Sequence, residues 1–342
     1  KSFASAAGLL QRIASDVKTP GFCRQLVLLV HRSSIQWFRQ SWHRAIFLGV
    51  ISGSSVVLAV LDTFVVKEAQ WQVDPFLNLH TTLALLSSVF CLHVFSTDRP
   101  VFWRERESGL SVAAFYVSKV FANTFDLLLQ CFLLAAVYYM IRQPQVSFDV
   151  YFPPFLLVSF ASAGLGYAIS TIFPPRHGPF ITAITIFVGC GLLGHPLRVE
   201  TMSDGGLLET IMDVLSVTRW SVSLYFNSYL ETVDTTQFEG TQAMEAIHRI
   251  EEIYATPKLV SQILLGMRAE IFFLTAIGIF WHIVGFLRLA YSNRNRHRRA
   301  AVWKQRMYRV RSAMGRAGTR VWGEQRQEEL EEGVRRFKQI LA

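Results

Sequence analysis

The chain has 342 residues, of which 51% are hydrophobic and 17% are charged, and its formal net charge is +9. Soluble domains carry about 25% charged residues, so this composition argues against a soluble globular protein. The apolar residues gather into runs of roughly 18 to 25, the length that a helix needs to cross the hydrocarbon core of a membrane. The sequence therefore predicts an all-α, polytopic membrane protein.

Two classes of site are not indicated by the sequence. The four cysteines do not form a CxxC pair, so we expect neither a disulfide framework nor a metal site. The phosphate-binding pattern GxxxxGK[ST] and the enzyme patterns HExxH and GxSxG do not occur either. We therefore expect no catalytic residue and no cofactor in this chain.

The first recognisable element is a basic amphipathic segment, which follows a mixed stretch at residues 1–19. Between Gly21 and Arg44, apolar residues recur at helical spacing among four arginines. This pattern is typical of a helix that lies on a membrane surface before the chain enters the membrane. We assign residues 1–44 to a linker and a cytoplasmic connecting helix.

Six membrane spans are predicted in residues 45–291. Helices are expected because barrel strands would alternate in polarity, and these segments do not. Between the fifth and sixth spans lies a long loop, residues 198–270. The predicted spans are 45–66, 76–96, 113–141, 151–173, 179–197 and 271–291.

Orientation follows from the lysines and arginines that flank the spans, since these concentrate on the cytoplasmic side. They are dense before the first span, between spans two and three, and after span six. With an even number of spans, this places both termini in the cytoplasm.

The C-terminal segment, residues 292–342, is strongly basic. It has 14 Lys and Arg against 5 Asp and Glu, a balance of +9. Next to a membrane, such a segment favours anionic lipid headgroups over nucleic acid. An interfacial helix, a solvated tail and a partner-binding helix all remain open for it.

The polar residues of the predicted third span include Lys119, Asn123 and Asp126. Polar groups are costly in lipid, so they need a structural or functional reason. Lys119 and Asp126 are seven residues apart and share a helical face. Bracing of a neighbouring helix is the favoured interpretation, and a place on a transport path is the alternative.

The loop after the second span carries an unusual alternation of charge: Arg104, Glu105, Arg106 and Glu107. Orientation alone would not require the two glutamates. A short charged helix that ends at Gly109 suits docking on another protein through ion pairs.

With these parts in place, the chain resembles the transmembrane domain of the G-subfamily of ABC transporters, the white and pleiotropic-drug-resistance type. The resemblance covers about residues 20–291. It rests on the connecting helix, on Phe102, Glu105, Ser108 and Gly109 after span two, on Tyr116 and Lys119, and on an aromatic stretch at 216–231 with Arg219 and Trp220.

The resemblance implies an ATPase domain, with ATP and magnesium, that either precedes this chain on the same polypeptide or is separate. It implies pairing with a second half-transporter in the membrane and a re-entrant segment before the last span. Arg104, Glu105, Arg106, Glu107 and Gly109 would then couple ATP hydrolysis to helix movement. Because the first residue is Lys1, not Met, we expect the chain to be part of a longer one.

The resemblance also implies a substrate slot between spans two and five of the two halves. It nominates Thr82, Leu86 and Phe90 in span two, with Thr182, Thr185, Val188 and Leu192 in span five. Helix packing is the alternative role for these residues. A slot of this composition has no fixed charge, so lipids, sterols or other hydrophobic compounds are the expected substrates.

The expected function is therefore the permease domain of an ATP-driven exporter. A stand-alone permease subunit with a separately encoded ATPase is one alternative. A non-transporting membrane scaffold that presents its basic tail to lipids or partners is the other.

Overall fold

The computed structural model describes residues 20–65, 73–96, 98–107, 109–144, 146–195, 214–232 and 268–291, with short pieces at 331–332 and 334–335. Within this part of the chain all regular structure is helical. The all-α prediction is thus confirmed. Almost all of the basic tail, most of the loop 198–270, Ser108 and the side chain of Glu107 lie outside the described residues.

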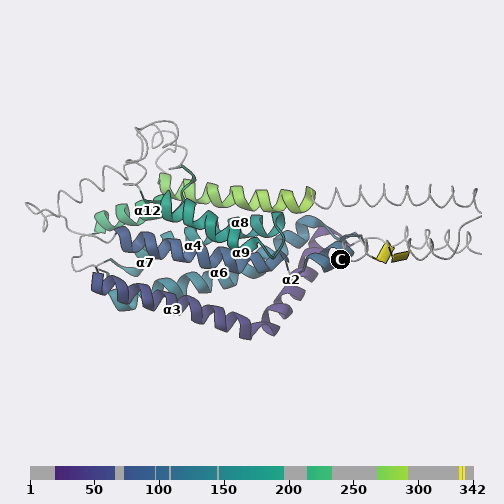
Figure 1. Ribbon diagram of the computed structural model, residues 1–342, viewed down its shortest axis with the longest axis horizontal. Coiled ribbons are helices and arrows are strands. Elements are labelled where there is room, and N and C mark those ends of the chain that lie inside the picture. The colour runs from purple at the N-terminus through teal and green to yellow at the C-terminus, as the bar shows by residue number, and fades with distance from the viewer. Residues whose placement is uncertain are drawn as a thin grey trace, which may run out of the picture.

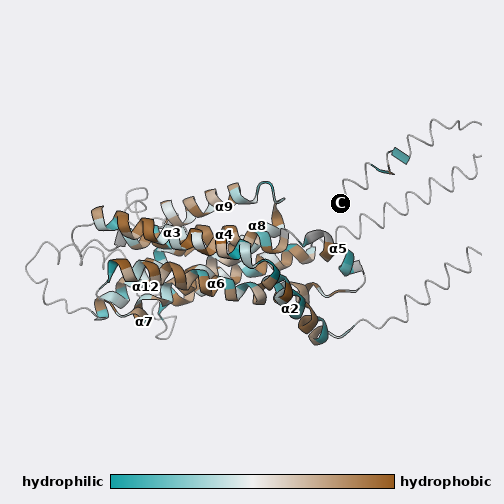
Figure 2. Cartoon of the chain, turned by 90° about the horizontal axis from the view of Figure 1, so that it is seen from below, coloured by the Kyte–Doolittle hydropathy of each residue, from teal (hydrophilic) through white to brown (hydrophobic). Residues whose placement is uncertain are grey.

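Long helices run side by side and form one elongated bundle (Figure 1). Helix α2 is inclined to the other helices at one end of the bundle, where α5 also lies (Figure 2), while α7 and α12 lie at the opposite end. In chain order the helices are α2 (Phe22–Arg39), α3 (Ser41–Val65), α4 (Val73–Ser96), α5 (Arg99–Glu107), α6 (Val112–Arg142), α7 (Phe148–Tyr151), α8 (Pro153–Ile172), α9 (Gly178–Ile186), the π-helix η2 (Phe187–Leu192), α12 (Val217–Thr232) and a last helix (Ala269–Tyr291).

Five helices among the described residues are long and apolar enough to cross a membrane, with mean hydropathies from 1.4 to 2.0. They are Ser41–Phe64, Pro75–Phe95, Val112–Arg142, Phe148–Ile172 and Ala269–Tyr291. Apolar residues predominate along these helices, whereas α2 carries many hydrophilic ones (Figure 2). The chain is therefore a multi-pass integral membrane protein.

The predicted fifth span, residues 179–197, coincides with a shorter apolar helix, Gly178–Leu192. At 1.5 Å per residue this helix is roughly 22 Å long, against about 30 Å of hydrocarbon. Its last part is a π-helix, and Leu193 closes that part by donating its N–H to the Val188 carbonyl at 2.9 Å. The chain then turns at Gly194, where the sequence pattern predicted that the helix would continue.

Helix α8 lies at the centre of the bundle, and all of residues 161–171 are buried. Its most extensive partner is α4. A Cβ atom at Gly166 would lie 2.5 Å from the Ser88 carbonyl oxygen and 2.8 Å from the Cys91 Cβ. On another face, a Cβ at Gly164 would lie 2.9 Å from the Gly278 carbonyl oxygen. Small residues thus let α8 approach α4 and the last helix at backbone contact, as is common between membrane helices.

The connecting helix α2 ends at Arg39, and α3 begins two residues later. Hydrogen bonds nonetheless continue across the break, because Gln40 donates to the Gln36 carbonyl at 3.1 Å and Arg44 donates to the Gln40 carbonyl at 3.2 Å. One side of α2 packs on α6. Phe38 and Trp42 on the outer side are 70% and 73% exposed, which suits a helix that lies at a membrane surface.

Candidate functional site

The short charged helix α5 connects α4 to α6 and ends in a Schellman motif. Gly109, at φ 100°, donates its N–H to the Arg106 carbonyl at 3.1 Å, and Leu110 donates to the Glu105 carbonyl at 3.2 Å. Glycine adopts this left-handed conformation without steric penalty. The glycine therefore ends α5 and redirects the chain into α6.

One face of α5 is anchored in the bundle. Phe102 is 1% exposed, and its ring lies 4.4 Å from the ring of Phe115 on α6. Arg104 on the other face is exposed, and Arg106 donates to the Leu110 carbonyl. Helix α5 thus joins a buried aromatic anchor to a charged outer face.

Helix α2 is fastened to α5 and to the turn that follows it. Arg32 Nη1 lies 2.5 Å from Glu105 Oε1. Gln25 accepts a hydrogen bond from the Ser111 backbone N–H at 2.9 Å and donates to the Gly109 carbonyl at 3.5 Å. We call these contacts the α2–α5 clamp. They join residues 73 to 86 positions apart in the sequence.

Lys119, Asn123 and Asp126 of α6 each contact another helix. Lys119 forms an ion pair with Asp98 and donates to Gln36 Oε1 on α2 at 3.0 Å. Asn123 donates to the Tyr167 hydroxyl on α8 at 2.7 Å and lies 3.4 Å from the Cys91 sulfur on α4. These contacts support the bracing interpretation.

Asp126 is the most heavily engaged of the three. Its carboxylate pairs with Arg44 and accepts a hydrogen bond from Trp37 Nε1 at 2.8 Å. The Arg44 guanidinium also lies over the Trp37 ring, 5.2 Å from its centre. Sequence reasoning named Asp126 but none of these partners. The signal available was an arginine at the start of the first span, which needs a counter-charge once it enters the membrane.

Replacing Asp126 with asparagine is expected to lower stability. Asparagine still accepts from Trp37, but it leaves Arg44 without its counter-charge. Breaking a buried pair costs about 3–5 kcal/mol, and 19% exposure of the Arg44 side chain favours the low end. The midpoint of thermal unfolding in detergent measures the effect. Asp149→Asn on the exposed start of α7 is the matched control, and equal midpoints for the two variants would contradict the bracing role.

A cavity of about 500 Å³ lies where α2, α3, α4 and α6 meet. Its wall includes Trp37 and Arg44 from the α2–α3 segment, Phe90 from α4, and Lys119 and Asn123 from α6. Phe90 is thus the one nominated substrate residue that lines it. The cavity lies next to the α2–α5 clamp, because Asp98 in its wall accepts from the Phe102 N–H in the first turn of α5 at 2.9 Å.

The other nominated residues of α4, Thr82 and Leu86, lie farther from α5 than Phe90 does. Thr82 and Leu86 are half-buried, and Thr82 donates its hydroxyl to the Asn78 carbonyl at 2.8 Å. The nominated residues of α9 and η2 differ among themselves in exposure. Thr182 is fully buried inside this chain, whereas Val188 and Leu192 are 40% and 36% exposed.

Thr185 is half-buried and donates to the Ile181 carbonyl at 2.8 Å. Helices α4 and α9 pack against each other, so both sets of nominated residues lie along neighbouring helices. Apart from Phe90, none of these residues lines the cavity described above.

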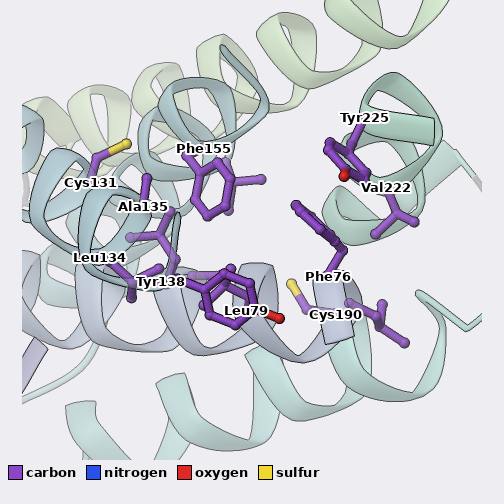
Figure 3. Close-up of a cluster of buried hydrophobic side chains, with 14 of the residues drawn as sticks. Phe76, Leu79, Cys131, Leu134, Ala135, Tyr138, Phe155, Cys190, Val222 and Tyr225 are labelled. Carbon is purple, nitrogen blue, oxygen red and sulfur yellow. The ribbon is translucent and has the colours of Figure 1, made fainter. Parts of the chain in front are cut away.

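At the opposite end of the bundle, α12 covers α4. Tyr225 stacks on Phe76, with ring centres 3.6 Å apart and the ring planes 11° apart (Figure 3). One turn away, the Ser221 hydroxyl lies 2.9 Å from Nδ1 of the fully buried His80. Helix α12 is therefore fixed to α4 through a pair of aromatic rings and a buried hydrogen bond.

Three further contacts hold α12 against η2 and the last helix. Thr218 donates to the Cys190 carbonyl of η2 at 2.6 Å. Glu270 of the last helix accepts from Asn227 at 2.7 Å, and Trp220 stacks on Phe273 of the same helix at 4.3 Å. The aromatic stretch singled out in the sequence, residues 216–231, is thus almost entirely a helix that packs into the bundle. In the part of the chain that the structure covers, no group of three or more side chains could hold a metal ion.

Comparison with known proteins identifies the family. The family model described as ABC-2 type transporter matches residues 7–293. ABC transporter G family member 25 of Oryza sativa subsp. japonica is 25% identical over 158 residues, which is 46% of this chain and 16% of the relative. The ABC-type transporter claG of Penicillium crustosum is 25% identical over 239 residues, 63% of this chain and 31% of the relative.

ABC transporter G family member 28 of Arabidopsis thaliana is 20% identical over 224 residues, 66% of this chain and 19% of the relative. The chain therefore spans less than a third of each of these three relatives. The resemblance to the G-subfamily is confirmed by these matches. Together with the apolar helices and the match over most of its length, they show that this chain is a membrane domain of the ABC-2 type transporter family.

Proposed function

We propose that this chain is the permease domain of an ATP-driven exporter for lipids, sterols or other hydrophobic compounds. The α2–α5 clamp carries this proposal. A short helix with a buried aromatic anchor and a charged outer face is suited to receive force from a second domain. The ion pair between Arg32 and Glu105 gives that force a direct path into α2.

The partner at this end is a nucleotide-binding domain that holds ATP and magnesium, on the same polypeptide or separate. It contacts the exposed side of α5, on which Arg104 lies. Movement of α5 is passed through Glu105 and Arg32 to α2. From α2 it reaches α6 through the hydrogen bond from Trp37 to Asp126, and from the first turn of α3 through the Arg44–Asp126 pair.

In this proposal the shorter helix α9 with η2 is a sixth membrane span, and α12 is a re-entrant segment. Both termini then lie in the cytoplasm, on the α2–α5 side. The contacts of α12 with α4, η2 and the last helix support its place as the outer cover of the bundle. The basic tail faces anionic lipid on the cytoplasmic side.

Transport takes place between two such domains, identical or related. The slot is formed by α4 and α9–η2 of each, with Val188 and Leu192 on its surface because their side chains are exposed in a single copy. Thr182 supports the wall from inside, since it is fully buried. Substrates are apolar because this surface offers no charged side chain.

The test is ATP-dependent transport by the full polypeptide that carries this chain, purified with any ATPase that accompanies it and placed in lipid vesicles. We expect vanadate-sensitive ATP hydrolysis and ATP-dependent movement of a fluorescent lipid or sterol. If neither occurs and no ATPase accompanies the chain, the exporter proposal fails.

A scaffold that acts through its basic tail is the second candidate, favoured by the +9 balance of residues 292–342. Deletion of these residues separates the two functions. A transporter should retain ATP hydrolysis and lipid movement without them, whereas a scaffold should lose its function.

A further inference from the structure

The cavity between α2, α3, α4 and α6 has two chemically different sides. Near α5 its wall is polar, with Gln36, Asp98 and Lys119. Farther from α5 the rings of Phe47 and Phe90 form an aromatic part of the wall, beside Arg44 and Asn123. Phe90 lies about two helical turns before Asp98, so the two sides are separated along the bundle. A molecule that fills this space must therefore be amphipathic.

The lysine, the arginine and the aspartate of the wall are each paired, and two histidines, His43 and His93, also line the cavity. Lys119 pairs with Asp98, and Arg44 pairs with Asp126, which itself does not line the cavity. The Lys119 and Asp98 side chains retain 14% and 21% exposure, so each can still form a hydrogen bond with a ligand. A charged ligand would leave one charge unmatched in a site of low dielectric constant, which is costly. An uncharged head that both donates and accepts hydrogen bonds fits this pattern best.

The apolar side favours a ring over a flexible chain. The rings of Phe47 and Phe90 lie 4.9 Å apart and are tilted by 40°, and Trp37 adds a third aromatic side chain to the wall. Aromatic walls pack well against flat or ring-shaped groups. The volume of about 500 Å³ lies within the range of roughly 300–1,000 Å³ that is typical of sites for small molecules.

We propose that this cavity binds a neutral amphiphile, with a hydroxyl or amide head beside Lys119 and Asp98 and a ring-containing body against Phe47 and Phe90. Such a ligand contacts α2, α3, α4 and α6 at once, beside the α2–α5 clamp. Its binding does not depend on the exporter proposal. Only an effect of the ligand on ATP hydrolysis would rest on that function.

The test is photolabelling of the full polypeptide in lipid nanodiscs with a benzophenone that carries a hydroxyalkyl head. The corresponding carboxylate and amine, with the same ring body, are the comparison probes. We expect the alcohol to label peptides of α4 and α6 that line the cavity, in a manner that excess unlabelled alcohol prevents. The two charged probes should label these peptides at least about fivefold less, which is about 1 kcal/mol in affinity.

Two variants fill the cavity from different walls: Ala122→Phe on α6 and Val94→Phe on α4. Each is expected to reduce labelling by the alcohol about tenfold or more. Ala45→Phe, on the exposed side of α3 next to Arg44, is the matched control and should leave labelling unchanged. Two independent variants keep the test decisive if one of them does not fold.

Three outcomes overturn the proposal. The first is labelling that excess alcohol does not prevent, or that spreads over the lipid-facing surface. The second is labelling that persists in a correctly folded Ala122→Phe or Val94→Phe variant. The third is equal or stronger labelling by the carboxylate or the amine, which would contradict the uncharged head. Absence of ATP-dependent transport by the unsubstituted polypeptide, with labelling as expected, would count only against the exporter proposal.

Discussion

Glu105→Arg is expected to reduce ATP-dependent transport about tenfold or more, while the protein remains folded. The new arginine faces Arg32 across the α2–α5 clamp, so the two helices repel each other where they should move together. Stability should change little, because the two side chains are 43% and 29% exposed and such pairs contribute roughly 0.2–1 kcal/mol. Transport of a fluorescent lipid, measured beside vanadate-sensitive ATP hydrolysis, separates loss of coupling from loss of the ATPase.

Charge reversal at both positions provides the sharpest control. The double variant Arg32→Glu with Glu105→Arg restores opposite charges and should recover a substantial part of transport. Arg24→Glu, on the exposed side of the same helix, should have little effect. If the double variant is as inactive as Glu105→Arg alone, the ion pair is not the path between the domains, and Glu105 acts through another contact.

Gly166→Leu is expected to prevent formation of the folded bundle. Even a single Cβ there would meet the Ser88 carbonyl oxygen at 2.5 Å, and backbone cannot move aside as a flexible side chain can. Gly166→Ala should therefore cost about 1–3 kcal/mol, and leucine more. The yield of monodisperse protein in detergent and the midpoint of its thermal unfolding measure the two variants.

The matched substitution is Gly53→Leu in α3. A Cβ at Gly53 has no neighbour within 4 Å among the described residues, and leucine favours a helix by up to about 1 kcal/mol over glycine. This control should fold as well as the original protein. A Gly166→Leu variant that is as stable as Gly53→Leu would show that α8 and α4 are not held at backbone contact.

The sequence predicted those parts of the fold that are set by local pattern. Continuous apolar runs indicated the long helices, and alternating charge followed by Gly109 indicated the short helix α5. The shorter fifth helix was harder to foresee, since its apolar run continues past Leu192. Its end depends on tertiary contacts, such as the hydrogen bond from Thr218 to the Cys190 carbonyl.

In the candidate site, too, the sequence indicated single residues but not the contacts between helices. Asp126 was noticeable because a carboxylate inside an apolar run is unusual, but its partner Arg44 lies in a different helix. The pairing of Arg32 with Glu105 likewise joins residues 73 positions apart. The cavity had no signal of its own, because its wall is assembled from separate helices and its polar groups looked like flanking charges. The proposed slot between two copies remains a prediction.

The break at Gln40 has a mechanical consequence. Gln40 is bonded to both helices, since its N–H donates to Gln36 in α2 and its carbonyl accepts from Arg44 in α3, so a change of angle between α2 and α3 is centred on it. Helix α2 has 18 residues and is therefore about 27 Å long. A tilt of about 10° would carry its far end by about 5 Å, close to one helical turn. Under the exporter proposal, the start of α3 would therefore move far less than the start of α2, so that a large displacement near α5 would reach the membrane helices as a small one.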